Sequence, residues 1–285
     1  MIERLEIHAN KMRFTARAAG PENGRQVLLL HGFPQTSSCW RSVLTSLGNE
    51  GYRAVAPDQR GYSVDARPVM VEDYAIGHLE NDVMAVANAM EMHTFDLVGH
   101  DWGGLLAWLV ATRNPDRVRS LTAVSTPHPL ALREVLLGPG RKRTDRRVPG
   151  YMDIFRDLAV PERLLLGEDG SGSGLLEVLA EVGLEGPAAK EYAQAMAEPG
   201  ALTAALNWYR AMDGDVLDDL LPVAVPTLFV WGNNDAALGR TAAELTADWV
   251  IGLYNFEVLE GINHWIPETA PAELSERIMA HLRVT

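Results

Sequence analysis

Cysteine is nearly absent from this chain. Cys39 is its one thiol, so no disulfide can form within the chain, and such scarcity is typical of proteins from a reducing compartment. Basic residues are also too few to balance the acids: 25 Lys and Arg stand against 38 Asp and Glu, a net charge of −13. A chain of this charge gains nothing from counterion release on nucleic acid, so we expect no nucleic-acid partner.

No hydrophobic run is long enough to span a membrane. One of the longest is Leu105–Ala111, whereas a bilayer-spanning helix needs about 20 apolar residues. The first residues, Met1–Glu6, carry acids and no apolar stretch, which argues against a secretory signal. We therefore expect a cytoplasmic protein without a membrane partner.

Cofactor motifs are missing as well. The sequence has no dinucleotide-binding fingerprint, no HExxH pair and no paired-cysteine metal site. We therefore expect neither a bound cofactor nor a metal ion.

What remains is the composition of a folded α/β protein. Hydrophobic residues make up 47% of the 285 positions and charged residues 22%, which excludes disorder and low complexity. Short apolar runs that end in turn residues recur at 27–30, 54–56, 95–98, 121–124, 227–231 and 256–259. Runs that are apolar throughout suit parallel strands covered on both faces. With helical stretches such as 82–90 and 102–113 between them, they predict an α/β fold with a mostly parallel sheet flanked by helices.

The strand–helix alternation stops between about residues 129 and 222, where helical patterns continue without a strand. We therefore expect a helical insertion at 129–222 between two parts of one α/β core, 1–128 and 223–285. The insertion contains a basic run, 141–147, which we interpret as a solvated face at a hinge. Its glycine-rich run, 167–174, follows no strand and lacks the Lys-Ser/Thr ending of a phosphate loop, so we expect a flexible loop.

One motif carries most of the chemistry. Gly99-His100-Asp101-Trp102-Gly103 follows a predicted strand and opens a predicted helix, with the glycine spacing of the G-x-S-x-G nucleophile elbow. Small residues let the chain turn sharply enough to present one side chain at the carboxyl edge of the sheet, where open α/β sheets bind ligands. We therefore expect Asp101 to be a nucleophile.

An aspartate at this position indicates displacement at saturated carbon. A serine that attacked an sp³ carbon would be left as an ether, which water does not readily open. A carboxylate that attacks the same carbon becomes an ester, and water then restores the acid by attack at its carbonyl. The electrophile is therefore an epoxide, a carbon–halogen bond or a similar group.

Ester hydrolysis needs a base, an orienting acid and oxyanion donors. His264 follows the last predicted strand and Asp235 the one before it, which gives the chain order nucleophile, acid, histidine of α/β-hydrolases. No strand end presents the weaker rivals of Asp235, which are Asp213, Asp215 and Asp248. The oxyanion donors are expected to be the backbone N–H groups of Trp102 and of Phe33, in the loop His31-Gly32-Phe33-Pro34.

With these motifs, nearly the whole chain resembles the epoxide hydrolase family of the α/β-hydrolase fold. HGxP at residues 31–34 and GHDWGG at 99–104 are similar to the family's oxyanion and nucleophile motifs. The resemblance implies that the insertion is a cap whose two tyrosines hold and protonate the departing oxygen. Asn207–Arg210 resembles the second cap motif and supplies Tyr209; Tyr151–Arg156 resembles the first more loosely and supplies Tyr151.

The expected reaction is hydrolysis of a small hydrophobic epoxide to a vicinal diol through an ester on Asp101. We expect Phe33, Pro34, Trp102 and Trp265 to line the pocket. Two alternatives stay open: a haloalkane or haloacid dehalogenase with the same nucleophile, and a hydrolase fold that only binds a ligand. Asp58-Gln59-Arg60-Gly61 is interpreted as an Asp/Arg pair that braces a loop. Substrate identity, enantiopreference and oligomeric state stay undetermined.

Overall fold

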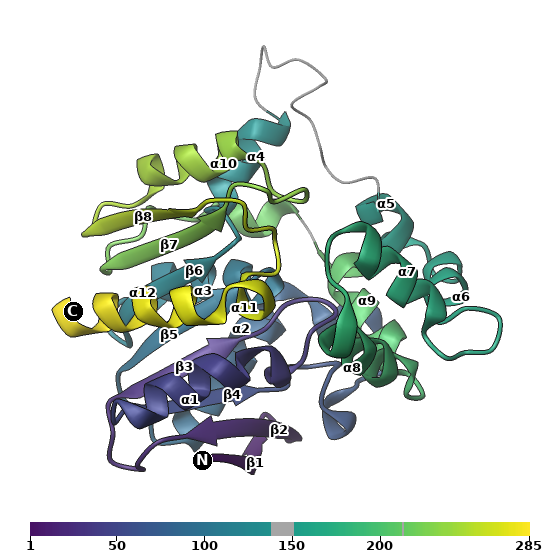
Figure 1. Cartoon of the computed structure of the whole chain (residues 1–285), viewed down its shortest axis with the longest axis horizontal. Helices are drawn as coiled ribbons and strands as arrows, with labels where there is room; N and C mark the ends of the chain where they lie inside the picture. Colours follow the sequence, from purple (N-terminus) through teal and green to yellow (C-terminus); the bar gives the residue numbers. More distant parts are fainter. Residues whose placement is uncertain (138–150, 213) are drawn as a thin grey trace.

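A computed structural model describes residues 1–137, 151–212 and 214–285 of the chain. The basic run 141–147 and Asp213 therefore lie outside the described residues, and so do the side chains of Tyr151 and Asp215. The centre of the molecule is an eight-stranded sheet in the order β1-β2-β4-β3-β5-β6-β7-β8 (Figure 1). From β4 to β8 all neighbouring strands are parallel, as the apolar runs predicted.

The six predicted apolar runs lie within β3 to β8. Strands β3 to β7 are almost entirely buried because helices cover both faces of the sheet. The bounds are β3 (Gln26–Leu30), β4 (Arg53–Pro57), β5 (Phe95–His100), β6 (Val118–Val124), β7 (Thr227–Gly232) and β8 (Tyr254–Leu259). The carboxyl ends of these parallel strands meet at one edge of the sheet, which is where the loops with the predicted site residues begin.

A hairpin that the sequence analysis did not foresee extends the sheet at one edge. Strands β1 (Ile2–Ala9) and β2 (Met12–Ala19) pair antiparallel, and β2 pairs antiparallel with β4. Exposed and buried residues mix along β1, because this edge strand has one solvated face. The pattern contrasts with the continuous apolar runs of the parallel strands.

Helices on both faces shield the sheet. Helices α1 and α12 lie together on one face, and α2 and α3 lie on the other (Figure 1). The bounds are α1 (Arg41–Asn49), α2 (Ile76–Ala89), α3 (Trp102–Arg113), α10 (Arg240–Leu245), α11 (Ile266–Thr269) and α12 (Pro271–Val284), with the 3₁₀ helices η1 (Ser37–Trp40), η2 (Val64–Ala66), η3 (Val71–Tyr74) and η5 (Thr246–Trp249). In the described part of the chain, no helix has the length and apolar character needed to cross a bilayer.

The described residues between β6 and β7 form helices, as the sequence predicted for the insertion at 129–222. They are α4 (Pro129–Leu137), α5 (Tyr151–Arg156), α6 (Val160–Leu166), α7 (Ser173–Glu181), α8 (Gly186–Ala197), α9 (Ala201–Arg210) and η4 (Gly214–Leu217). Helices α5 to α9 pack on one another as a separate layer beside the sheet (Figure 1), which we call the cap. Helix α4 instead packs against α10 and η5 of the core, so the expected boundary at residue 129 includes one helix that packs with the core.

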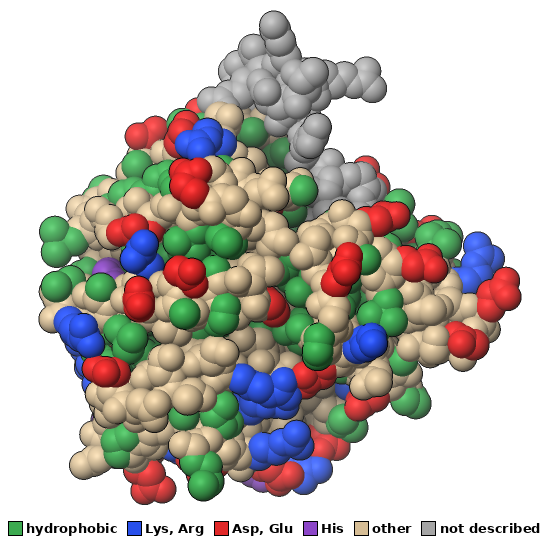
Figure 2. All heavy atoms as spheres, viewed as in Figure 1, with side chains coloured by type: hydrophobic (Ala, Val, Ile, Leu, Met, Phe, Trp, Pro, Cys, Tyr) green, Lys and Arg blue, Asp and Glu red, His purple; other side chains and the backbone are tan. Residues whose placement is uncertain are grey.

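Charge is spread over the surface despite the excess of acids. On the face in Figure 2, acidic and basic side chains alternate over the core and over the cap. Many of these charges pair, as in Arg41–Glu191, where the guanidinium and carboxylate are 2.6 Å apart and join α1 to α8. Residues 167–172 of the glycine-rich run form the connection between α6 and α7, and Ser173 and Gly174 begin α7.

Candidate active site

The predicted elbow joins β5 to α3. Its apex, Asp101, has φ 53° and ψ −121°, a conformation that non-glycine residues rarely adopt. The flanking glycines leave no room for a side chain: a Cβ on Gly99 would lie 2.1 Å from the carbonyl oxygen of Gly103, and a Cβ on Gly103 would lie 2.2 Å from that of Leu30. The glycine spacing therefore holds a strained residue at the carboxyl edge of the sheet.

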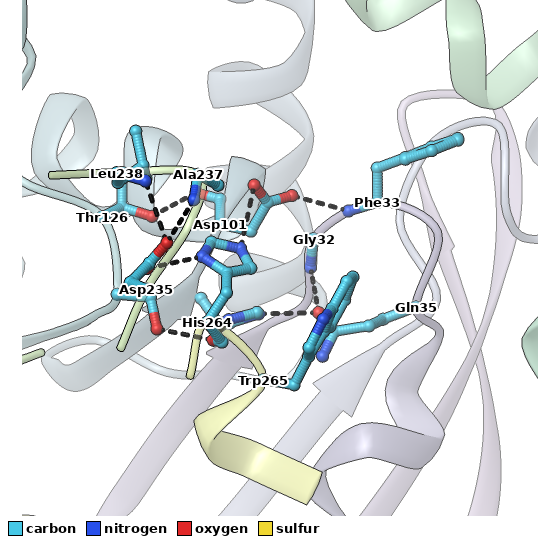
Figure 3. A network of polar contacts seen from close by, with 12 residues as sticks. Gly32, Phe33, Gln35, Asp101, Thr126, Asp235, Ala237, Leu238, His264 and Trp265 are labelled. Atoms are coloured by element: carbon cyan, nitrogen blue, oxygen red, sulfur yellow. Dashed lines mark hydrogen bonds and ion pairs between the residues drawn. The ribbon is translucent and has the colours of Figure 1, made fainter. Parts of the chain in front are cut away.

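The carboxylate of Asp101 lies between two predicted partners (Figure 3). The backbone N–H of Phe33 donates to Oδ1 at 2.8 Å. Oδ2 faces Nε2 of His264 at 3.6 Å. The side chain is 19% exposed, so one carboxylate oxygen is anchored to the oxyanion loop while the other stays near the histidine.

His264 and Asp235 form the expected pair. Nδ1 of His264 is 2.8 Å from Oδ2 of Asp235, whose side chain is fully buried. The other oxygen of Asp235 accepts the backbone N–H groups of Ala237 at 2.7 Å and Leu238 at 2.9 Å. The acid is thus held by the loop after β7 and orients the imidazole that follows β8.

The charges of this cluster depend on one another. Burial opposes the charged form of His264, but the carboxylates of Asp235 and Asp101 raise its pKa to about 10. Burial likewise opposes the charge of Asp101, yet the histidine and the Phe33 N–H lower its pKa below the ordinary value. The resting site at neutral pH therefore holds an imidazolium between two carboxylates.

Sequence reasoning missed the polar residues behind Asp101 and His264. The backbone carbonyl oxygen of His264 accepts a hydrogen bond from Ser125 Oγ at 2.8 Å and lies 2.9 Å from Nε2 of His100. The buried side chain of Gln35 contacts His100 and, on its other side, Glu268 of α11. The only signal for Gln35 and Glu268 was their closeness in sequence to the HGxP loop and to His264.

A cavity of about 190 Å³ opens above Asp101 between the core and the cap. Phe33, Pro34 and Trp265 lie on its wall, together with Asp101, His264 and Tyr209. The other described lining residues are Phe155, Leu175, Val178, Leu179, Val182, Ala236 and Ala237. Apart from Asp101, His264 and the Tyr209 hydroxyl, the described lining is therefore apolar.

Trp102 was expected to line the pocket, and this stays a prediction. The residue is 6% exposed and contacts Tyr209, which lies on the cavity wall. Its ring packs edge-on against Tyr209 and Trp208 of α9, with centroids 4.9 Å and 5.7 Å away, because α3 turns it toward the cap helix. Trp102 thus supports the tyrosine from behind.

Of the two cap tyrosines, Tyr209 is fully described. It is 5% exposed, lies on α9 and faces the cavity. Its ring meets those of Phe33 and Phe155 edge-on at 5.4 Å and 5.1 Å. Tyr151 begins α5, but its side chain lies outside the described residues. The cap therefore presents the Tyr209 phenol at the cavity, and the surrounding aromatic rings hold it in place.

The interpretation of Asp58–Gly61 needs a correction. Arg60 pairs with Asp82 of α2, at 2.6 Å from Nε to Oδ2, and not with Asp58. Asp58 instead accepts the backbone N–H of Ser37 at 2.6 Å and the hydroxyl of Thr15 at 2.8 Å. Asp58 and Asp82 each hold part of the loop after β4, but Asp82, the partner of Arg60, comes from the distant helix α2.

Among the described residues, no group of three or more His, Cys, Asp or Glu is arranged to hold a metal ion.

The site and fold together define a class of protein. A nucleophile on a strand–turn–helix elbow, an acid after β7 and a histidine after β8 are the arrangement of α/β-hydrolases. Here an aspartate occupies the position that serine has in esterases.

Comparison with known proteins narrows this class. A family model described as the alpha/beta hydrolase fold matches residues 26–167. The chain is 32% identical to the AB hydrolase superfamily protein YfhM of Bacillus subtilis, over 97% of this chain and 96% of that protein. It is also 32% identical to epoxide hydrolase 3 of Xenopus tropicalis, over 98% of this chain and 77% of that one.

A solved structure agrees with these relatives. The crystal structure of epoxide hydrolase A from Mycobacterium thermoresistibile matches with a TM-score of 0.82 and 26% identity, over 99% of this chain and 98% of that chain. The chain belongs to the epoxide hydrolase family of the α/β-hydrolase fold.

Proposed function

We propose that this protein hydrolyses an epoxide to a vicinal diol through a covalent ester on Asp101. The observation that carries the proposal is the position of the Asp101 carboxylate. It faces an apolar cavity, with Oδ1 bonded to the N–H of Phe33 and Oδ2 beside His264. The family's named relatives include epoxide hydrolases, which supports the choice of an epoxide as the electrophile.

In the first step, Oδ2 of Asp101 attacks one epoxide carbon and the bond from that carbon to the ring oxygen breaks. Oδ1 stays on the Phe33 N–H and becomes the carbonyl oxygen of the ester. The lowered pKa of Asp101 keeps the nucleophile ionised at neutral pH. The apolar wall excludes water, which would otherwise solvate and weaken this carboxylate.

The departing ring oxygen needs a proton donor, because an alkoxide is a poor leaving group. Tyr209 lies on the cavity wall and supplies its phenolic proton in this proposal. Tyr151 is proposed as the second donor. The aromatic cluster around Tyr209 fixes the ring from several sides, so the hydroxyl is presented in one orientation.

In the second step, His264 takes a proton from water and the hydroxide attacks the ester carbonyl carbon. Ester formation has removed the charge of Asp101, one of the two causes that raise the pKa of His264. The pKa of His264 therefore falls, and the imidazolium gives up its proton more readily. In this proposal that proton returns to the Tyr209 phenolate left by the first step, so the neutral ring is then available as base. The oxyanion forms on Oδ1, where the N–H groups of Phe33 and Trp102 are its proposed donors. Collapse releases the diol and restores Asp101.

The alternatives receive less support from the site. A dehalogenase of this kind pairs the indole after the nucleophile with an Asn or a second Trp, but Phe33 and Pro34 occupy the loop where an Asn would help. A receptor without activity has no need of a nucleophile, an acid and a base in contact. A halide-releasing activity remains a measurable outcome of the test below.

The test is a single turnover with the His264→Gln variant and styrene oxide. Alkylation needs no base, whereas hydrolysis does, so the variant should accumulate one substrate mass on the peptide that contains Asp101. In ¹⁸O water, the wild type's first-turnover diol should be unlabelled and the label should appear in Asp101. A labelled first-turnover diol would mean direct attack of water, and the covalent route would be lost. Chloride release from a haloalkane without diol formation would favour the dehalogenase.

A further inference from the structure

A buried hydrogen-bonded chain runs behind the catalytic residues, from the cap to the oxyanion loop. The hydroxyl of Tyr192, on α8 of the cap, donates to Oε1 of Glu268 at 2.6 Å. Nε2 of Gln35, just after the HGxP loop, donates to the same oxygen at 2.7 Å. Tyr192 is 1% exposed and Gln35 is fully buried. Figure 3 shows Gln35 beside Gly32 and Trp265, on the side of the oxyanion loop away from the Phe33 ring.

The backbone fixes the orientation of the Gln35 amide. The N–H of Gly32 donates to Oε1 of Gln35 at 3.1 Å, and a backbone N–H can only donate. Oε1 therefore faces Gly32, and the NH₂ group must face Glu268 and find an acceptor there. The same Oε1 lies 2.7 Å from Nδ1 of His100. Gln35 thus contacts the residue before Phe33 and the residue before Asp101.

We propose that Glu268 is a positioning residue for ester hydrolysis: it orients Gln35, which holds the oxyanion loop against the elbow, and it ties both to the cap through Tyr192. The inference rests on the proposed function, because it concerns the oxyanion formed on Asp101. It gives the cap a part in the second step as well as in the first.

A carboxylate suits this position better than an amide. Two donors converge on Oε1 of Glu268, and hydrogen bonds to an ionised acceptor are about twice as strong as neutral ones. Oε2 is buried and has no hydrogen-bond partner among the described residues, so an NH₂ group placed there would lack an acceptor. A neutral side chain at 268 would therefore hold Gln35 and Tyr192 more loosely.

The charge of Glu268 changes within the working pH range. Burial raises its pKa to about 7, against the opposing effect of the donors Tyr192 and Gln35 and of the charge on His264. Tyr192 and Cys39 of η1 are also titratable groups near it, and burial raises the pKa of both side chains above their ordinary values. The stronger, ionised form of Glu268 is thus gained as the pH rises through neutrality.

The test compares Glu268→Gln with the wild type and with Glu273→Gln, which removes an exposed carboxylate on the neighbouring helix α12. Single-turnover rates are measured with styrene oxide from pH 6 to pH 9. Loss of a whole oxyanion donor costs about 10²–10³-fold, so a loosened donor should slow ester hydrolysis about 10-fold at pH 8. Alkylation should stay within about 2-fold of the wild type, because no new charge develops on Oδ1 in that step.

The pH profile distinguishes positioning from a purely structural role. Tyr192→Phe removes a donor that favours the ionised form of Glu268, so the inflection of the hydrolysis rate should move to higher pH. In Glu268→Gln that inflection should disappear, and in Glu273→Gln it should stay. An unchanged hydrolysis rate and an unchanged inflection in folded Glu268→Gln would overturn the inference. If Glu268→Gln does not fold, as judged by near-UV circular dichroism, the Tyr192→Phe profile decides alone.

A failure of the proposed function would look different. In that case the wild type itself would form no ester on Asp101 with any epoxide, and the inference would fall with it. Ester formation and hydrolysis in the wild type, together with a Glu268→Gln variant that matches Glu273→Gln, would overturn the inference alone.

Discussion

At the core edge, Asp101, Phe33 and His264 are held by backbone geometry and hydrogen bonds of 2.8 Å, whereas the cap helices α5, α7 and α9 present mainly apolar side chains to the same cavity. The core side of the site holds largely buried charged groups, among them the paired Asp101, His264 and Asp235. The cap side is mainly apolar and carries the Tyr209 phenol. In the proposed mechanism the two regions therefore contribute differently: the core makes and breaks the bonds, and the cap supplies the donor that meets the departing oxygen.

The largest effect should follow from removing the nucleophile of the core. Asp101→Ala should lower turnover by at least about 10⁴-fold, because the proposed covalent route then has no nucleophile. The fold should persist, since the side chain is 19% exposed and lies at a turn. Turnover of an epoxide is measured alongside Asp116→Ala, which removes an exposed carboxylate just after α3. Substantial activity in folded Asp101→Ala would assign the nucleophile elsewhere.

Replacing a glycine by alanine should lower the free energy of unfolding more in the core than in the cap. A Cβ at Gly103 of the core would lie 2.2 Å from a backbone oxygen, whereas one at Gly170 of the cap would meet nothing within 4 Å. Gly103→Ala should therefore cost about 3 kcal/mol of unfolding free energy or more. Gly170→Ala should cost only about 1 kcal/mol of unfolding free energy, because the one penalty there is an alanine at a positive φ of 71°. Chemical denaturation measures both, and equal costs would contradict the close approach at the elbow.

The charged cluster of the core should make stability depend on pH. The pKa of His264 is raised from 6.5 to about 10 in the folded state, so its stabilising contribution is complete below pH 6.5 and is lost as the pH rises toward 10. The wild type should lose on the order of 2 kcal/mol more than His264→Gln over this interval. Urea denaturation at a series of pH values gives the difference. Parallel curves for the two proteins would show that the imidazolium does not stabilise the fold.

The smallest of these effects is expected from the cap. Tyr209→Phe should slow alkylation about 10-fold, less than the usual 10²–10⁴-fold for loss of a general acid, because a second donor is proposed. Ester hydrolysis should be unchanged, since the departing oxygen is already protonated. Single-turnover rates are compared with Tyr254→Phe, which removes a buried hydroxyl at the start of β8. Equal alkylation rates in the two variants would remove Tyr209 from the mechanism.

The sequence predicted the core more completely than the cap. All six apolar runs lie within parallel strands, and the helix expected at 102–113 coincides with α3. These features depend on local periodicity and on glycines that a sharp turn requires. The β1–β2 hairpin was missed because a half-exposed edge strand leaves a weaker pattern. The boundaries of the cap and the role of Tyr151 stay predictions.

Pairings outside the motifs could not be predicted. Arg60 was expected to pair with its neighbour Asp58, but it bonds Asp82, and nothing in the sequence indicated that Trp102 packs on α9. Both depend on how helices pack on the sheet. Glu268 and Tyr192 carry no motif, and only the docking of α8 beside α11 brings their oxygens to 2.6 Å.

By itself, the sequence determined which residues form the candidate site: an aspartate on an elbow, a histidine after the last strand and an acid after the strand before it. Spacing suffices there, because parallel strands deliver their carboxyl ends to one edge. The tertiary structure alone decided which oxygen of Asp101 is anchored, which way Trp102 faces and how the cap is joined to the oxyanion loop. Those outcomes depend on side chains from distant segments competing for the same buried space and the same hydrogen bonds, and local sequence does not encode that competition.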